Sequence, residues 1–178
     1  MQPYTPESIN GFRAELEAGQ FPHIEIARHG RVYKCYVLPQ GIKHELPDFA
    51  LPFTPHPRLL RISKEPENIT VFCISDSIRK NVRDLVGGHE IDEFTQIGIE
   101  TPGRCQMASA MEIQSLSDQR DLSETEIREY LQMRISYFQN LQEYAASKSS
   151  FTPADINDFA ESQRVFGEAL AKRNCVIK

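Results

Sequence analysis

The chain has 178 residues, of which 40% are hydrophobic and 25% are charged, with a formal charge of −5. This length can bury a core without disulfides or metals, and the composition is typical of a soluble globular protein. The acidic balance lacks the basic excess of a general phosphate-backbone binder, so we do not expect nucleic acid as a partner. Because no apolar run approaches the roughly 18 residues of a membrane span and no signal-peptide pattern begins the chain, we expect a cytoplasmic protein without a membrane partner.

The cysteines and histidines show no metal-binding spacing. The four cysteines, Cys35, Cys73, Cys105 and Cys175, are far apart, which favours reduced thiols in a chain without a leader. The segment from His89 to Glu93 carries four ionisable residues, but Glu93 stands where the His-Glu-x-x-His zinc pattern has its second histidine. We therefore predict an acidic loop there, and neither a metal nor a cofactor.

The first third of the chain predicts a helix and a hairpin. Residues 6–18 have helical spacing, with Thr5 as a cap and proline at the first helical position. Residues 23–28 and 31–38 alternate between apolar and polar, and the His29-Gly30 turn between them favours a β-hairpin. Residues 39–57 form a long, proline-rich, irregular segment.

The middle of the chain predicts further strands and two helices. Residues 58–63 and 69–74 have the composition of strands. We expect residues 75–77 to cap a helix over residues 78–86, which Gly87 and Gly88 would end. A strand over residues 94–99 and a helix over residues 104–116 follow.

The last third predicts a pair of antiparallel helices. Ser123 and Glu126 have the spacing of a capping box, and an apolar face repeats at helical spacing after them. Thr152 and Pro153 begin a second helix after a short polar loop. We expect Phe138 and Phe166, one on each apolar face, to lie against each other or against the sheet.

These elements together predict an α+β fold. We expect a mostly antiparallel sheet with an N-terminal helix and a C-terminal antiparallel helical hairpin. The predicted division is a sheet domain over residues 1–120 and the hairpin over residues 121–178, packed as one compact unit.

The first functional hypothesis is a protein-interaction or regulatory module of the chaperone, adaptor or immunity type. The order of its elements is similar to that of small secretion chaperones, which implies another protein as the partner, with a homodimer as an alternative. Apolar side chains in the 39–57 segment must either pack on the core or contact another chain. The expected contact residues are Leu46, Phe49, Leu51 and Phe53.

The second hypothesis is a small hydrolase or transferase. Arg28-His29-Gly30 resembles the Arg-His-Gly motif of the histidine phosphatase superfamily, which implies that His29 accepts a phosphoryl group beside an arginine charge, with His89 as a second histidine. An ordinary hairpin turn is the alternative interpretation.

Cys105, near a predicted helix N-terminus, is the other candidate nucleophile. Its base would be one of the earlier histidines, His44, His56 or His89, oriented by Glu90 or Asp92. A structural cysteine is the alternative.

The third hypothesis is an anion- or nucleotide-responsive regulator. The turn at residues 75–77 and nearby arginines could hold an anionic group if they converge. The candidate residues are Arg28, Ser75, Ser77, Arg79 and Arg83. A solvated helix face is the alternative.

Overall fold

The computed structural model describes residues 21–38, 72–97, 101–119, 121–149 and 151–175, together with Ala14 and Ala18. Its contacts divide the chain into two compact units, Met1–Gln96 (unit 1) and Ile97–Lys178 (unit 2). These contacts do not test whether domains fold independently, so the predicted division at residue 120 stays a prediction.

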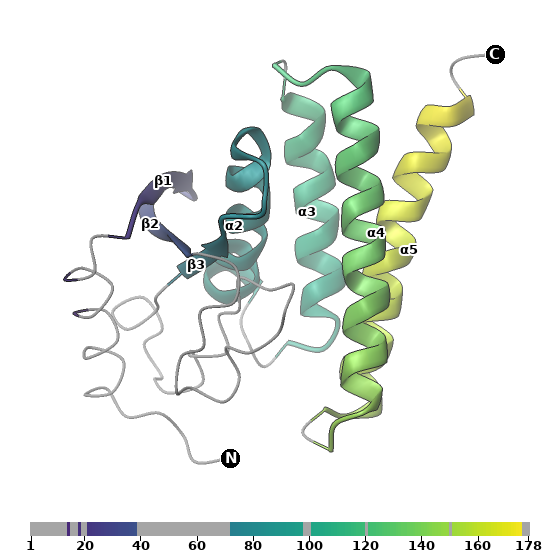
Figure 1. The fold of residues 1–178 in the computed structure, drawn as a ribbon. Helices are drawn as coiled ribbons and strands as arrows, with labels where there is room; N and C mark the ends of the chain where they lie inside the picture. The colour runs from purple at the N-terminus through teal and green to yellow at the C-terminus, as the bar shows by residue number, and fades with distance from the viewer. Residues whose placement is uncertain are drawn as a thin grey trace. The chain divides into compact units, whose positions relative to one another are not determined.

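Unit 1 contains a three-stranded sheet in the order β1-β2-β3 (Figure 1). Its strands are β1 (His23–Arg28), β2 (Arg31–Leu38) and β3 (Phe72–Ser75). The first two strands are antiparallel, which confirms the predicted hairpin, and β3 runs parallel to β2. The turn residues His29 and Gly30 have φ values of 51° and 76°, the left-handed conformation of a tight hairpin turn.

The predicted fold class is wrong. The described chain is mostly helical, with a small mixed sheet in place of a mostly antiparallel one. The first element with defined bounds is strand β1, not the N-terminal helix that we predicted over residues 6–18, most of which lie outside the described residues. The strand predicted over residues 58–63 also lies outside them. Strand β3 can pair in parallel because the connection from β2 is long enough for a crossover.

The helical segment after β3 also differs from the prediction. A 3-10 helix, η3 (Lys80–Val82), leads into α2 (Arg83–Ile91), and a π-helix, η4 (Asp92–Ile97), follows directly. Neither η3 nor α2 has a side-chain cap, so residues 75–77 do not act as the predicted N-cap. The π-helix replaces the strand expected over residues 94–99; the Thr95 hydroxyl donates a 2.7 Å hydrogen bond to the Ile91 carbonyl there.

Gly87 and Gly88 lie inside α2, and they do not end it. A Cβ atom on Gly87 would overlap Cδ1 of Ile26, and one on Gly88 would lie 2.7 Å from Cζ and 2.8 Å from Nε of Arg28. Gly87 therefore allows α2 to lie close to the buried side chain of Ile26, whereas the atoms near Gly88 belong to the flexible end of the Arg28 side chain. Glycine is unfavourable inside a helix, and the close contact with Ile26 offsets that cost at Gly87.

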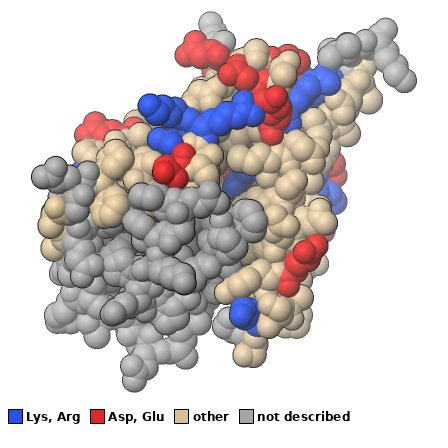
Figure 2. Space-filling view, viewed as in Figure 1, with Lys and Arg blue, Asp and Glu red and all other residues tan. Residues whose placement is uncertain are grey.

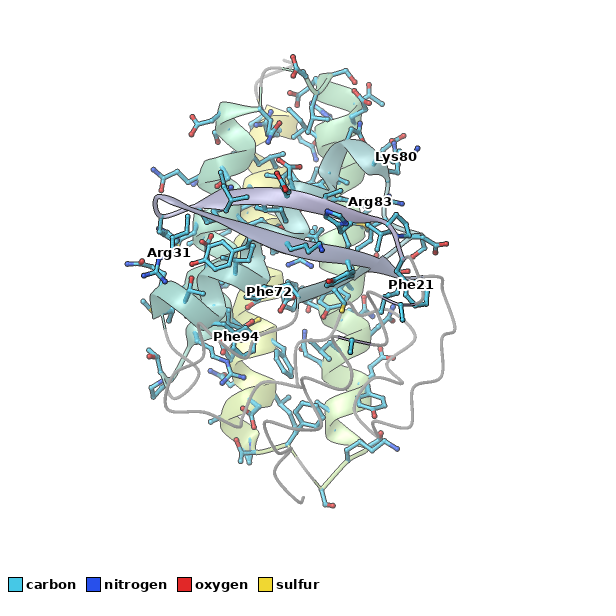
Figure 3. The ribbon with its side chains drawn as sticks, turned by 90° about the vertical axis from the view of Figure 1, so that its left-hand side faces the viewer. Phe21, Arg31, Phe72, Lys80, Arg83 and Phe94 are labelled. Carbon is cyan, nitrogen blue, oxygen red and sulfur yellow. The ribbon has the colours of Figure 1, made fainter. Side chains whose placement is uncertain are left out.

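The core of unit 1 lies between the sheet and α2, which packs on β1 and β3. The Phe72 ring lies edge-on to Tyr33 at a centroid distance of 5.8 Å and to Phe94 at 6.5 Å. Figure 3 shows Phe72 and Phe94 near each other below the strands. The side chain of Phe94 thus joins η4 to the sheet without forming a strand.

The described part of unit 2 contains three helices that lie side by side (Figure 1). They are α3 (Arg104–Asp118), α4 (Glu124–Ala146) and α5 (Pro153–Cys175). The three predicted helices are confirmed, and so is the capping box of Ser123 and Glu126. Helix α5 packs on α3 as well as on α4.

A buried polar group lies among the helices of unit 2. Nη2 of Arg134 donates a 2.8 Å hydrogen bond to Oε2 of Glu112, and the Tyr130 hydroxyl donates to Oε1. The guanidinium also lies 4.9 Å from the Phe138 ring centroid and 5.2 Å from that of Phe166. These two rings stack at 5.7 Å, which confirms their predicted contact.

Burial alone would lower the pKa of Arg134, because a low-dielectric environment disfavours charge. The nearby Glu112 carboxylate outweighs this effect, so the pKa of Arg134 is raised above its ordinary value. The arginine therefore stays charged inside unit 2, and its carboxylate partner compensates the cost of burying that charge.

Among the described residues, no helix combines the length and the apolar character that crossing a membrane requires.

We predict opposite effects for two Gly→Ala substitutions in helices. Gly87→Ala should lower the free energy of unfolding by about 1–3 kcal/mol, because the new methyl group would overlap Cδ1 of the buried Ile26 side chain. Gly167→Ala in α5 should raise it by about 0.5–1 kcal/mol, because nothing lies within 4 Å of the new Cβ. Urea denaturation followed by circular dichroism measures both. Equal effects of the two substitutions would contradict the close packing of α2 on β1.

We also predict that Arg134→Met lowers the free energy of unfolding by about 3–5 kcal/mol, since it leaves the Glu112 carboxylate buried without its cation. Arg164→Met is the control: Arg164 forms exposed pairs with Glu161 and Glu168, so its removal should change stability little. Urea denaturation again provides the measurement. A loss below about 1 kcal/mol for Arg134→Met would mean that the pair does not stabilise unit 2.

Candidate functional site

Three ionisable side chains of unit 1 form what we call the turn cluster: Arg28, His29 and Asp92. Arg28 ends β1, His29 begins the hairpin turn, and Asp92 is the first residue of the π-helix η4. Helix α2 brings Asp92 to the turn because its glycines let it lie close to β1. Residues that are 63 positions apart in the sequence thereby come into contact.

The strongest contact of the turn cluster joins the histidine to the aspartate. Nε2 of His29 lies 2.7 Å from Oδ1 of Asp92, and Nε of Arg28 lies 3.9 Å from Oδ2. The side chain of Asp92 is 3% exposed, whereas that of His29 is 34% exposed. A buried carboxylate therefore lies behind an imidazole that solvent can reach.

The guanidinium of Arg28 is held by groups of the protein itself. Nη1 donates to the Ala27 carbonyl at 3.1 Å, and Nη2 donates to the Asp84 carbonyl at 3.5 Å. The guanidinium also lies close to Gly88. These contacts direct both terminal nitrogens of Arg28 to backbone carbonyls, and its predicted anion-binding role stays a prediction.

The geometry of the turn cluster suits acid–base chemistry. In the neutral tautomer that carries its hydrogen on Nε2, His29 donates to the Asp92 carboxylate and has its lone pair on the other ring nitrogen, Nδ1. A fixed imidazole with a lone pair facing outward from its carboxylate can accept a proton or attack an electrophile.

His89, the second histidine of the phosphatase-like prediction, has a different carboxylate nearby. Its side chain is 2% exposed, and Nε2 lies 3.8 Å from Oε2 of Glu93. The structure therefore places His29 with Asp92 and His89 with Glu93.

The serines and Arg83 of the predicted anion site come together at the turn after β3. The Ser75 and Ser77 hydroxyls lie 2.7 Å apart, while Nε and Nη2 of Arg83 donate to the carbonyls of Ile78 and Asp76, both at 2.8 Å. Arg83 therefore stabilises the turn.

Other charges of the predicted anion site lie elsewhere or on the surface. Arg28 belongs to the turn cluster, and Arg79 is exposed. Figure 3 shows Lys80 and Arg83 at the opposite end of the strands from Arg31. Figure 2 shows basic side chains with acidic ones beside them on one face. Binding of an anion by these residues stays a prediction.

Cys105 lies in the first turn of α3, as its predicted helix position requires. Its thiol is buried, and the amides of Cys105 and Gln106 donate to the two carboxylate oxygens of Asp158 at 3.0 and 2.8 Å. The Asp158 carboxylate therefore accepts the hydrogen bonds of the amides that would otherwise stabilise a thiolate at this helix end.

The predicted contact residues Leu46, Phe49, Leu51 and Phe53 lie outside the described residues, as do His44 and His56.

Asp92 was not predicted as the partner of His29. The sequence indicated it only as an acidic-loop residue and as an orienter for the base of Cys105, and it did not indicate Asp158 at all. A glycine pair inside an otherwise apolar helical pattern was the available signal for Asp92, because it indicates close packing of the helix on another element.

Comparison of the chain with protein-family models, with curated proteins and with solved structures finds no match.

We predict that Cys35 and Cys73 resist alkylation in the folded protein. Burial, with a contribution from the charge of Glu90, raises the pKa of Cys35 to about 12, and burial raises the pKa of Cys73 well above its usual range. Both thiols are therefore protonated at pH 8, where only a thiolate reacts. Mass spectrometry after iodoacetamide treatment should show exposed Cys175 modified first, and Cys35 and Cys73 only in denaturant. Equal labelling rates in the folded protein would contradict the burial of β2 and β3.

Proposed function

We propose that the protein is a small hydrolase or transferase in which His29 acts as the general base or nucleophile and Asp92 orients it. The observation that supports this proposal is the 2.7 Å contact between Nε2 of His29 and Oδ1 of Asp92. Enzymes that use histidine in either role hold the ring with a third group in this way.

The difference in exposure between the two side chains also supports the proposal. Asp92 is nearly inaccessible, so water does not weaken its hydrogen bond to the imidazole. The side chain of His29 is 34% exposed, so a substrate can reach it.

The contacts of Arg28 limit the inference about the substrate. In the histidine phosphatase superfamily, which the Arg28-His29-Gly30 motif resembles, arginine charge stabilises the phosphoryl group. Here Arg28 contacts Asp84, Asp92 and its neighbour Ala27. We therefore do not restrict the proposed substrate to phosphate esters, and carboxylate esters belong in the same test.

The protein-interaction hypothesis stays a prediction, because its expected contact residues lie outside the described residues. A protein partner, a homodimer and a cytoplasmic location also stay predictions. Turnover measurements on variants of the turn cluster separate this hypothesis from the proposed enzyme.

The test measures turnover of chromogenic phosphate, carboxylate-ester and peptide substrates by the wild type and two variants. His29→Asn removes the imidazole and retains a residue that tolerates the left-handed turn conformation. Asp92→Asn retains the shape of the side chain but removes its charge. We expect each variant to lose about 10²-fold or more of the wild-type kcat, since general-base catalysis contributes about 10²- to 10⁴-fold.

His23→Asn is the matched control, because His23 is an exposed histidine on the neighbouring strand β1 whose ring lies near Tyr36. It should retain wild-type turnover, and thermal melting should show that all three variants fold. Absence of turnover by the wild type, or full turnover by folded His29→Asn, would overturn the proposal. In the former case a pull-down for a protein partner would be the next experiment.

A further inference from the structure

We propose that Arg28 is a positioning residue of the turn cluster: its guanidinium holds the buried carboxylate of Asp92 in its ionised form behind His29. This inference rests on the proposed function, in which Asp92 orients the imidazole. It gives Arg28 an effect on the reaction without contact with the substrate. All three residues belong to unit 1.

The side chain of Arg28 bridges strand β1 and helix α2. Nη1 donates to the Ala27 carbonyl on the strand at 3.1 Å, and Nη2 donates to the Asp84 carbonyl on the helix at 3.5 Å. A Cβ atom on Gly88 would lie 2.7 Å from Cζ and 2.8 Å from Nε, so this glycine leaves the space that the guanidinium occupies. The cation is therefore held beside the part of α2 that leads to Asp92.

The remaining nitrogen of the guanidinium lies beside Asp92. Within the described part of the chain, Nε of Arg28 is buried without a hydrogen-bond partner, and it lies 3.9 Å from Oδ2 of Asp92. This distance is too long for a hydrogen bond, so the contact is one between charges. The Asp92 side chain is 3% exposed, and a carboxylate buried to this extent is costly without a compensating charge. Arg28 supplies that charge beside Oδ2, while His29 contacts the other oxygen, Oδ1.

The arginine charge opposes the uptake of a proton by His29 and Asp92. A positive charge within about 4–6 Å of a carboxylate favours its ionised form. The 2.7 Å contact couples His29 to Asp92, so a proton taken up by either one titrates the pair as a unit. Removing the cation therefore makes the pair bind a proton more tightly, whichever residue receives it. Because a general base works in its unprotonated form, Arg28 extends the active state of His29 to lower pH.

Other charged residues lie on the elements that meet at the turn. They are Arg31 on β2, Asp84, His89 and Glu90 on α2, and Glu93 on η4. His89 has Glu93 beside it at 3.8 Å, and the charge of Glu90 acts on the Cys35 thiol. All of these groups are retained when Arg28 is replaced, so comparison with the wild type isolates the charge of Arg28.

The first experiment follows the ring protons of His29 by NMR as the pH is changed, with folded His29→Asn to assign their signals. Arg28→Gln removes the charge and should raise the proton affinity of the pair by about tenfold or more, because an opposite charge at this distance shifts a titration midpoint by roughly one to three pH units. The midpoint then moves to higher pH. Arg28→Lys keeps the charge and should return the midpoint most of the way to its wild-type value.

Arg31→Gln is the matched control. Arg31 lies opposite Arg28 in the register of the hairpin, but it is exposed, so water and salt screen its charge. Figure 3 shows it at the hairpin end of the strands. This substitution should move the midpoint much less than Arg28→Gln does.

Gly88→Ala is a second test, in which every charge is retained. Its methyl group would overlap the guanidinium, which is the flexible end of a long side chain, so the cation moves at little cost in stability. The midpoint should again move to higher pH, by less than in Arg28→Gln. Thermal melting shows which variants fold.

The second experiment measures kcat of the wild type and Arg28→Gln between about pH 5 and pH 9. The loss of turnover should be larger at the acid end, whereas a purely structural role would lower kcat equally at every pH. Absence of turnover by the wild type overturns the proposed function, while the NMR titration decides the role of Arg28 separately. An unchanged midpoint in folded Arg28→Gln, or an equal shift in Arg31→Gln, overturns the proposal for Arg28. If Arg28→Gln does not fold, an unchanged midpoint in Gly88→Ala has the same consequence.

Discussion

The close contact between α2 and strand β1 is the constraint on which the rest of unit 1 depends. Two successive glycines remove the side chains that would hold the helix away from Ile26 and Arg28. With the helix at this distance, the Arg28 guanidinium can lie across it and reach Asp84 and Asp92. The contact between His29 and Asp92 lies at the end of this helix, beside the same strand.

The three helices of unit 2 could be predicted well because the sequence patterns that indicate each helix involve residues close together in the chain. The capping box at Ser123 locates the start of α4 to within a few residues, and the pair Thr152-Pro153 does so for α5. Helical spacing then identifies the apolar face of each helix. The β-hairpin was predictable for the same reason, since His29-Gly30 separates two alternating segments. In each case, residues close in the sequence determine the structure.

The errors concern interactions between distant residues. Gly87 and Gly88 have the local pattern of a helix end, and only the presence of β1 beside them explains why the helix continues. The parallel pairing of β3 depends on the path of a long connection. Likewise, nothing near Asp92 in the sequence indicates His29, so the candidate site could be predicted only in part: its histidine and arginine, but not its carboxylate.

The carboxylate of Asp158 has a consequence for the order in which unit 2 can form. Helix α3 begins after Gly103 without a side-chain cap of its own, and its first amides bond to a residue on α5. Those amide donors lack this partner until a residue 53 positions beyond Cys105 has left the ribosome. During synthesis, the first amides of α3 therefore gain this carboxylate only after the α5 segment that carries Asp158 has been made.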